Sequence, residues 1–527
     1  MSTPKSRNQE TKELSNRKVL VIGLDGATWD LIKPWAEEGN LPAFKKLMDE
    51  GVYGNLKSTL PIHTIPAWNC MLTGKNPGKL GVFTFLQKDP DSHVFHPYFF
   101  INKPERNSII DILSKNRKRV CSINLPTTHS TYKINGCMVG GWLYNSNKPF
   151  TYPEKLKSEL DRITGGYEID TYQDIDVPHL GGEEIENTEE FLKCLYRITE
   201  KRAKATQYLL NKYDWDFFMV VFTGPDRIQH KLWEDKNEIE KYYQYIDKII
   251  AKLLDKIDDE VVTILVSDHG FGPQSRVFNI NEWLIEKGLL KLRIDWRTKL
   301  RRTLGWLHLW HLGRRFLPSH LKNRIGAKIH AISFEKANID WSKTKAYSYS
   351  RCGEIYINLK GRKKDEEYEE LRNRVIKELK ELKIVGKKIP INVFKKEEIY
   401  FGKYIDKAPD LIIQLDDNIC GINTRIGYGS IFSNGEGGNH RIHGIFLAHG
   451  SGIKKGVEIQ GTKIYDIAPT ILYIMGVPIP KDMDGRVLKE IFEEDSELYK
   501  KSITYQEIDE KVRLKERIRE LKTLREI

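Results

Sequence analysis

Acidic residues follow three short apolar runs in this sequence, and carboxylates in such places can bind metal ions. Asp25, Asp226 and Asp268 each come within four residues of the end of a run. The runs are Lys18–Leu24, Phe217–Phe222 and Val261–Val266. Nearly all-apolar runs bounded by polar residues predict strands that are buried on both faces of a parallel sheet. Ligands gather beyond the carboxyl ends of such strands, so the three carboxylates should converge at one edge.

Carboxylates that converge in this way repel each other, and a cation has to offset the repulsion. A pair of divalent metal ions is the simplest answer. Asp226 and His230 are one helical turn apart and could chelate one ion, and Asp268 with His269 forms a second pair. Alone, an Asp-x-x-x-His pair is more often a surface or capping arrangement. The joint placement of both pairs at strand ends favours metal sites.

Two further imidazoles, His440 and His443, come just before a fourth apolar run at Ile445–Ala448. Carboxylate and neutral imidazole ligands together suit zinc, and they also suit manganese or iron. The sequence therefore predicts two divalent metal ions, with zinc as the first choice.

A candidate nucleophile, Thr64, lies in the segment Pro61–Gly74. We expect Thr64 to be the N-cap of a helix, with Pro66 in its first turn. A hydroxyl there lies beside free backbone amides, which can hold a phosphoryl oxygen. A metal ion bound to the hydroxyl would favour its alkoxide at neutral pH. A plain helix cap is the alternative, and the metal-ligand pattern disfavours it.

The elements that must position these residues predict an α/β fold. Apolar residues recur at three- and four-residue spacing from Ile239 to Ile257, which predicts an amphipathic crossover helix. Such helices between buried strands indicate a mainly parallel central sheet flanked by helices. The stretch 279–392 breaks this rhythm, and we interpret it as an inserted cap. The predicted segments are a flexible N-terminal segment (1–17), the first part of the catalytic core (18–278), the cap (279–392), the second part of the core (393–494) and a charged C-terminal helix (495–527).

Composition and charge narrow the class of protein. The chain of 527 residues carries a formal net charge of +12, which favours acidic partners such as phosphorylated substrates, anionic lipid surfaces or nucleic acid. Nucleic acid is the disfavoured partner because the sequence carries none of its binding motifs. No apolar run is long enough to span a bilayer, and residues 1–17 lack the apolar core of a secretory signal. With six scattered cysteines that suit reduced thiols, these features predict a cytoplasmic protein.

A basic, Trp-rich region lies inside the expected cap. Residues 291–331 contain eleven Lys and Arg residues and one Asp, interleaved with tryptophans and leucines. Such a segment could be an interfacial helix that brings the enzyme to a lipid-linked substrate at an anionic membrane. It could also pack its apolar face on the sheet, which is the interpretation we favour. Sedimentation with anionic liposomes at low salt distinguishes the two.

Taken together, the motifs resemble the type I phosphodiesterase/nucleotide pyrophosphatase branch of the alkaline phosphatase superfamily. They occur in the family's order from about residue 18 to 490, as Gly23–Asp30, Thr64–Trp68, Thr73–Gly78, Pro225–His230, Ser267–Gly272, Gly438–Arg441, Tyr465–Thr470 and Met483–Gly485. The resemblance implies an alkaline-phosphatase-like fold with an inserted cap. It also implies a role for each residue: one metal ion would be surrounded by Asp25, Asp268, His269 and Thr64, and the other would be held by Asp226, His230 and His440. Thr64 would attack phosphorus, and water would then displace the phosphothreonine by an in-line step.

Two positions depart from the family pattern. Ala67 stands three residues after Thr64, where the family has an asparagine that helps to hold the phosphoryl oxygen. Either Asn69 or backbone amides would do that work, or the substrate preference differs. Leu80 replaces a histidine, with no predicted consequence. The candidate substrate contacts are Asn69, Arg441 and His443, although a structural or supporting role suits His443 better.

The sequence thus predicts a metal-dependent hydrolase of phosphate esters, a phosphodiesterase or nucleotide pyrophosphatase that acts on a nucleotide, nucleotide-sugar or lipid-linked substrate. A phosphomonoesterase of the same superfamily is one alternative, because the fold does not settle the shape of the pocket. Another is a catalytically silent protein that binds an acidic or lipid-linked partner. A protein that has lost the catalytic activity of its family typically lacks one or more of the metal ligands, and none is missing here.

Overall fold

The computed structural model describes most of the chain as two compact units. The described residues are 17–88, 95–97, 108–126, 128, 131–142, 149–170, 187–293, 337–358, 366–384, 387–415 and 420–507. The first unit comprises residues 1–85, 97–271 and 440–527, and the second comprises 86–96 and 272–439. Each unit is described by itself.

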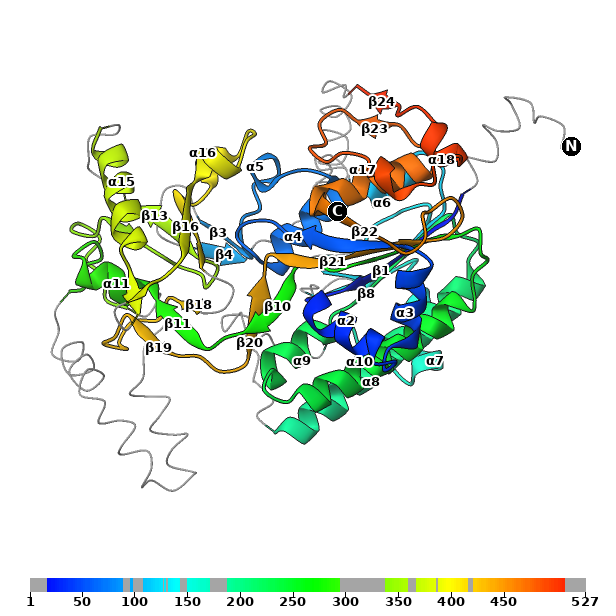
Figure 1. The fold of residues 1–527 in the computed structure, drawn as a ribbon, viewed down its shortest axis with the longest axis horizontal. Helices are drawn as coiled ribbons and strands as arrows, with labels where there is room; N and C mark the ends of the chain where they lie inside the picture. The colour runs from blue at the N-terminus through cyan, green and yellow to red at the C-terminus, as the bar shows by residue number, and fades with distance from the viewer. Residues whose placement is uncertain are drawn as a thin grey trace, which may run out of the picture. The chain divides into compact units, whose positions relative to one another are not determined.

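A nine-stranded sheet forms the centre of the first unit, in the order β22-β2-β21-β9-β1-β8-β5-β6-β7 (Figure 1). Its strands are β1 (Val19–Leu24), β2 (Val52–Lys57), β5 (Val120–Leu125), β6 (Gly136–Gly140), β7 (Thr151–Tyr152), β8 (Phe217–Phe222), β9 (Val262–Val266), β21 (His443–His449) and β22 (Val457–Lys463). The five strands from β9 to β6 are parallel to one another, whereas β21 and β7 are antiparallel to the strands beside them. The predicted mainly parallel α/β sheet is confirmed.

Helices cover both faces of this sheet, α2, α3, α8 and α10 on one face and α4, α6 and α17 on the other (Figure 1). The helices of the first unit are α2 (Trp29–Glu37), α3 (Pro42–Asp49), α4 (Thr64–Thr73), α5 (Pro77–Leu80), α6 (Ile109–Lys115), α7 (Leu156–Thr164), α8 (Thr188–Lys212), α9 (Gly224–Leu232), α10 (Lys236–Leu254), α17 (Ile467–Ile474) and α18 (Glu497–Lys500). All six residues of β1 are buried. Helix α10 is the predicted crossover helix, and it buries the expected apolar stripe, including Ile239, Ile246 and Leu253.

The second unit contains a four-stranded sheet in the order β12-β13-β17-β16 and a three-stranded sheet in the order β18-β11-β19. Its strands include β11 (Arg276–Asn279), β12 (Ala346–Tyr347), β13 (Glu354–Ile357), β16 (Ile391–Lys395), β17 (Leu411–Leu415), β18 (Cys420–Asn423) and β19 (Phe432–Asn434), and its helices include α11 (Ile280–Glu286), α15 (Glu366–Lys380) and α16 (Lys396–Ile399). All strand pairs of the four-stranded sheet are antiparallel.

The second unit differs in extent from the predicted cap. It begins at residue 272 rather than 279 in this part of the chain, and it continues to Asn439 rather than ending at 392. The expected boundary falls inside β16, which pairs with β17 along five residues and so belongs to the second unit. The alternation of apolar residues in these strands is the same whether they join one sheet or another, so the sequence pattern does not distinguish the two extents.

The two ends of the chain and the basic region are only partly described. Within the predicted C-terminal helix 495–527, helix α18 covers only Glu497–Lys500, and Tyr505–Gln506 forms strand β24, which pairs with β23 (Ile479–Pro480). Residues 508–527, residues 1–16 of the predicted flexible segment and residues 294–336 of the Trp-rich region lie outside the described residues. Among the helices that the structure describes, none is long and apolar enough to cross a membrane.

Candidate metal centre and nucleophile

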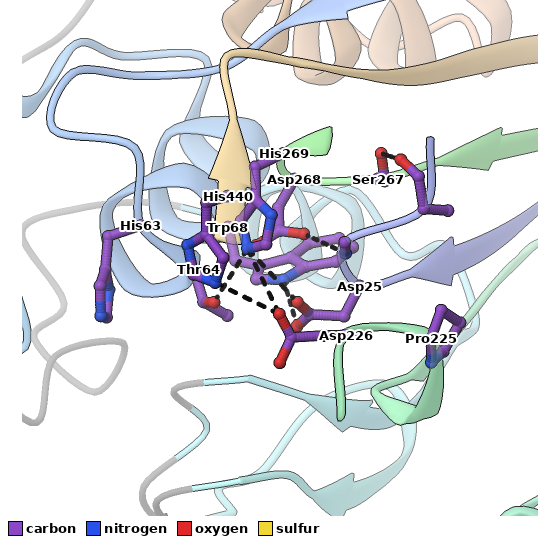
Figure 2. A network of polar contacts seen from close by, with 12 residues as sticks. Asp25, His63, Thr64, Trp68, Pro225, Asp226, Ser267, Asp268, His269 and His440 are labelled. Carbon is purple, nitrogen blue, oxygen red and sulfur yellow. Dashed lines mark hydrogen bonds and ion pairs between the residues drawn. The ribbon is translucent and has the colours of Figure 1, made fainter. Parts of the chain in front are cut away.

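Three neighbouring strands deliver the three acidic residues to one place. Asp25 directly follows β1, Asp268 follows β9 after one residue, and Asp226 lies in the first turn of α9 just after β8. Strand β1 lies between β9 and β8 and is parallel to both, so the carboxyl ends of all three strands lie at the same edge. Each of the three residues is at most 3 % exposed. The predicted convergence of the carboxylates is therefore observed (Figure 2).

His269 lies at the centre of the first group of candidate ligands. Its Nε2 is 3.3 Å from Thr64 Oγ1, 3.3 Å from Asp268 Oδ2 and 3.6 Å from Asp25 Oδ1. Its other nitrogen, Nδ1, lies 3.0 Å from the carbonyl oxygen of Gly270, which leaves Nε2 as the nitrogen that faces the cluster. The structure thus brings together the four residues expected around one metal ion.

The second group forms around Asp226. Its Oδ1 lies 3.4 Å from His230 Nε2 and 3.3 Å from His440 Nε2, and the two imidazole nitrogens are 3.0 Å apart. The ring of His269 stacks on that of His440 with centroids 3.7 Å apart, and its Nε2 is 3.9 Å from Asp226 Oδ1. His269 therefore lies within reach of both groups, an arrangement that motif spacing does not reveal.

Each carboxylate uses one oxygen in a hydrogen bond and turns the other toward the histidines. Asp25 Oδ2 accepts from Trp68 Nε1 at 3.2 Å, Asp268 Oδ1 accepts from the Gly26 N–H at 3.2 Å, and Asp226 Oδ2 accepts from Arg227 at 3.3 Å. The remaining oxygens, Asp25 Oδ1, Asp226 Oδ1 and Asp268 Oδ2, are buried without a hydrogen-bond partner among the described residues. Buried carboxylate oxygens that lack a donor but lie near imidazole nitrogens fit the ligand set of divalent metal ions.

Burial and mutual repulsion shift the ionisation of these groups. Burial, with the charges of Asp268 and Asp226, raises the pKa of Asp25 well above its ordinary value. Burial, with Asp226, raises the pKa of Asp268 to about 8. Burial opposes ionisation of Asp226 as well, but the positive charges of the nearby His230 and His440 hold its pKa well below the usual range. Burial and mutual repulsion therefore oppose the ionisation of Asp25 and Asp268, and a bound cation would favour it.

The helix that carries Thr64 begins differently from the prediction. Thr64 is the first helical residue of α4, and the N-cap is His63, whose Nδ1 accepts from the Ile65 N–H at 3.3 Å. The Ala67 N–H donates to the carbonyl of His63 at 3.1 Å, and Pro66 has no N–H. The expectation that Thr64 is the cap, with several free amides beside it, is therefore wrong. Of the first four helical residues, only Thr64 has an N–H with no hydrogen bond to another described residue.

The three candidate substrate contacts lie in different surroundings. Asn69 is 1 % exposed, and its Nδ2 donates to the carbonyl of Ile65 at 2.8 Å, one turn back in α4. Arg441 donates to the carbonyl of His440 at 3.1 Å. His443 is exposed at the start of β21, where it pairs with Lys57. Their part in substrate binding stays a prediction.

Sequence patterns did not indicate the residues that hold the metal ligands in place. Trp68, Gly26 and Arg227 each donate to one of the three carboxylates, as described above, and the Ser58 hydroxyl donates to the backbone carbonyl of Asp268 at 2.5 Å. Only the position of Trp68 could be inferred from the sequence, because a residue one helical turn after Thr64 lies on the same face of α4. The other contacts join segments far apart in the chain.

A buried cluster of carboxylates, imidazoles and one hydroxyl beyond the edge of a mainly parallel sheet defines an alkaline-phosphatase-like hydrolase of phosphate esters. The chain belongs to the type I phosphodiesterase / nucleotide pyrophosphatase family, whose model matches residues 19–444. It is accordingly a hydrolytic enzyme of the phosphodiesterase/nucleotide pyrophosphatase type. No curated protein sequence matches the chain significantly.

Solved structures share the fold at low sequence identity. One is murine ectonucleotide pyrophosphatase / phosphodiesterase 5, as an inactive threonine-to-alanine variant in complex with AMP, which is 14% identical, with 90% of this chain and 100% of that chain covered and a TM-score of 0.51. Another is phosphonoacetate hydrolase from Sinorhizobium meliloti 1021 in complex with phosphonoformate, which is 13% identical, with 88% and 96% covered and a TM-score of 0.53. At these identities the likeness establishes the fold.

Proposed function

We propose that this enzyme hydrolyses phosphodiester or pyrophosphate bonds with two divalent metal ions and with Thr64 as the covalent nucleophile. One observation carries the proposal. Three buried carboxylates each direct an oxygen without a hydrogen-bond donor toward imidazole nitrogens, and the Thr64 hydroxyl lies 3.3 Å from the central imidazole. Such a cluster is costly without cations, whereas with them it is a site for phosphoryl transfer.

The ligand sets follow from the two groups of side chains. One ion would be held by Asp25, Asp268, His269 and Thr64, and the other by Asp226, His230 and His440. The mixture of carboxylate and imidazole favours zinc, with manganese or iron as alternatives. When bound, the ions supply Lewis-acid stabilisation of the phosphoryl charge and lower the pKa of the Thr64 hydroxyl.

The chain's own residues would then perform the following steps. Thr64 Oγ1 forms a bond to phosphorus while the bond to the leaving oxygen breaks on the opposite side, which gives a phosphothreonine that still carries the second substituent of the substrate. Water attacks the same phosphorus in line and releases Thr64. The Thr64 N–H at the start of α4 is placed to donate to a phosphoryl oxygen, in the role that the asparagine replaced by Ala67 has in the family.

The substrate class that we propose is a nucleotide, nucleotide-sugar or lipid-linked phosphodiester. Two observations support a small phosphorylated molecule: structures of the same fold hold AMP and phosphonoformate, and the net charge of +12 favours an anionic partner. We also propose a cytoplasmic location. The five cysteines whose side chains are described form no disulfide bond with one another, which suits a reducing compartment.

The test compares two chromogenic substrates. Metal-replete protein and a Thr64→Ala variant are incubated with bis-p-nitrophenyl phosphate and with p-nitrophenyl phosphate, after metal analysis of each preparation. We expect about two metal ions per chain and faster turnover of the diester, which Thr64→Ala abolishes. Faster turnover of the monoester would assign a phosphomonoesterase instead. No turnover of either substrate with both ions bound would favour a binding protein or a narrow substrate range.

A further inference from the structure

Gly26 connects the three acidic residues of the metal centre. Its N–H donates to Asp268 Oδ1 at 3.2 Å, and it directly follows Asp25. A Cβ at this position would lie 3.1 Å from Asp226 Cα, so the two backbones approach closely. Its φ of +68° lies in the left-handed region that favours glycine. The position of this single residue therefore affects all three carboxylates.

Gln229 connects Gly26 to helix α9 through hydrogen bonds. Its side-chain amide donates one hydrogen to the carbonyl of Gly26 at 2.9 Å and the other to the carbonyl of Pro225 at 2.8 Å. The side chain is 0 % exposed. The opposite orientation of the amide would place its oxygen against two carbonyl oxygens, so these contacts fix its orientation. Gly26 adjoins Asp25 and Pro225 adjoins Asp226, so one side chain spans the two groups of ligands.

We propose that Gln229 is a positioning residue that sets the separation of the two metal sites. The inference rests on the proposed function, because it assumes that Asp25 and Asp226 hold different ions. Helix α9 carries Asp226 in its first turn and His230 in its last turn, so a shift of the helix would move two ligands of the second site together. The bond from Gln229 to Gly26 opposes that shift. Residues that orient metal ligands typically change metal affinity about 10- to 100-fold when they are replaced.

Two variants remove the bridge in different ways. Gln229→Met keeps the length of the side chain and removes both donors. Gln229→Asn keeps the amide, but it is one methylene too short to reach both carbonyls. The chain also offers a matched control in the second unit. Asn281 is 0 % exposed, and its Nδ2 donates to the carbonyls of Ser348 at 2.8 Å and Thr424 at 2.7 Å, neither of which is a candidate ligand. Asn281→Leu breaks a comparable bridge away from the ligand set, together with the hydrogen bond that Asn281 Oδ1 accepts from the Ser348 N–H at 3.0 Å.

The experiment titrates Co²⁺ into the metal-free full-length proteins, followed by calorimetry and by visible absorption, with thermal melting of each protein. We expect wild type to bind two Co²⁺ ions, and Gln229→Met to bind at least one of them about 10- to 100-fold more weakly with a changed spectrum. Asn281→Leu should lower the melting temperature but keep wild-type affinity and spectrum. If Gln229→Met does not fold, Gln229→Asn is judged by the same criteria.

Two results would overturn the inference. One is Co²⁺ affinity of the Gln229 variant within about twofold of wild type with the same spectrum, and the other is equal weakening in Asn281→Leu, which would make the effect one of general stability. Failure of the proposed function looks different, because wild type itself would then bind no pair of ions. If wild type and the Gln229 variant both bind two Co²⁺ ions normally, the result contradicts only the role of Gln229 and agrees with the proposed function.

Discussion

Trp68 offers a sharp test of how the metal centre is held, because its indole joins the nucleophile's helix to a candidate ligand. Trp68 lies one turn after Thr64 in α4, and its Nε1–H donates to Asp25 Oδ2 at 3.2 Å. The bond leaves Asp25 Oδ1 to face the histidines. Trp68→Phe keeps a buried aromatic ring at this position but removes the donor, so Asp25 becomes free to rotate or to keep a proton.

The expected loss follows from the kind of bond that is removed. A hydrogen bond to a charged group contributes about 1.5–3 kcal/mol, because the buried carboxylate is otherwise left without a partner. If the whole loss appears in the transition state, kcat/KM falls about 10- to 150-fold, at about 1.4 kcal/mol per tenfold. Metal affinity should fall over a similar range, since Trp68 orients a ligand rather than binding the ion.

A second tryptophan supplies the control. Trp283 is as fully buried as Trp68, but its Nε1 has no hydrogen-bond partner within the described part of the chain. Trp283→Phe therefore removes the same atoms without breaking a bond. Steady-state kinetics with a diester, metal analysis and thermal melting should show a loss of activity and metal affinity in Trp68→Phe alone. Equal effects in both variants, or activity of Trp68→Phe within about threefold of wild type, would refute the reasoning.

Two further predictions concern stability. Chelation of the metal ions should lower the melting temperature, and adding the ions back should restore it. A ligand present at a thousandfold its Kd stabilises the folded state by about 4 kcal/mol per site. An unchanged melting curve would contradict this prediction. Burial tends to raise the pKa of Asp216, but hydrogen bonds and charge from Arg119 outweigh it and hold this pKa below the ordinary value. That stabilisation is present above the ordinary pKa of about 3.9 and is lost as the pH falls through the lower folded value. Denaturant unfolding between about pH 5 and pH 2 should therefore show a smaller loss of unfolding free energy in Asp216→Asn than in wild type.

The central strands and their acidic residues could be predicted because the local pattern determines both. Runs such as Phe217–Phe222 are apolar on both faces, which suits a strand in a sheet that is covered on two sides. Such sheets are typically built from parallel strands with crossover helices. Since parallel strands share one carboxyl edge, the acids that follow them must meet. The clustering of Asp25, Asp226 and Asp268 followed from this topology without any knowledge of side-chain contacts.

The start of α4 could not be predicted because two neighbouring residues can both cap it. Threonine is a common N-cap, whereas histidine is not among the preferred residues, so propensity placed the cap at Thr64 instead of His63. The His63 ring accepts the Ile65 N–H and packs against Phe85, with ring centroids 5.0 Å apart. These tertiary contacts decide the cap, and they put the Thr64 hydroxyl beside His269 rather than on its own helix backbone.

The contacts that orient the metal ligands could not be predicted from the sequence either. Gln229 reads as an ordinary helical residue, and only the close approach of Gly26 to Asp226 gives its amide two carbonyls to bridge. The boundary of the second unit is another case, since pairing of β16 with β17 depends on which sheet the strand joins. Both depend on long-range packing, which no local pattern records.

The most direct test of the central claim is to identify the residue that becomes phosphorylated during turnover. Metal-replete protein is mixed with excess bis-p-nitrophenyl phosphate, quenched in acid within the first turnover and digested for tandem mass spectrometry. Attack of Thr64 expels one p-nitrophenolate and leaves the other on phosphorus, so we predict a p-nitrophenyl-phosphoryl adduct on the peptide that contains Thr64. We predict neither adduct nor turnover in Thr64→Ala that still holds two metal ions. An adduct on another residue, or turnover of Thr64→Ala within about tenfold of wild type, would contradict the account.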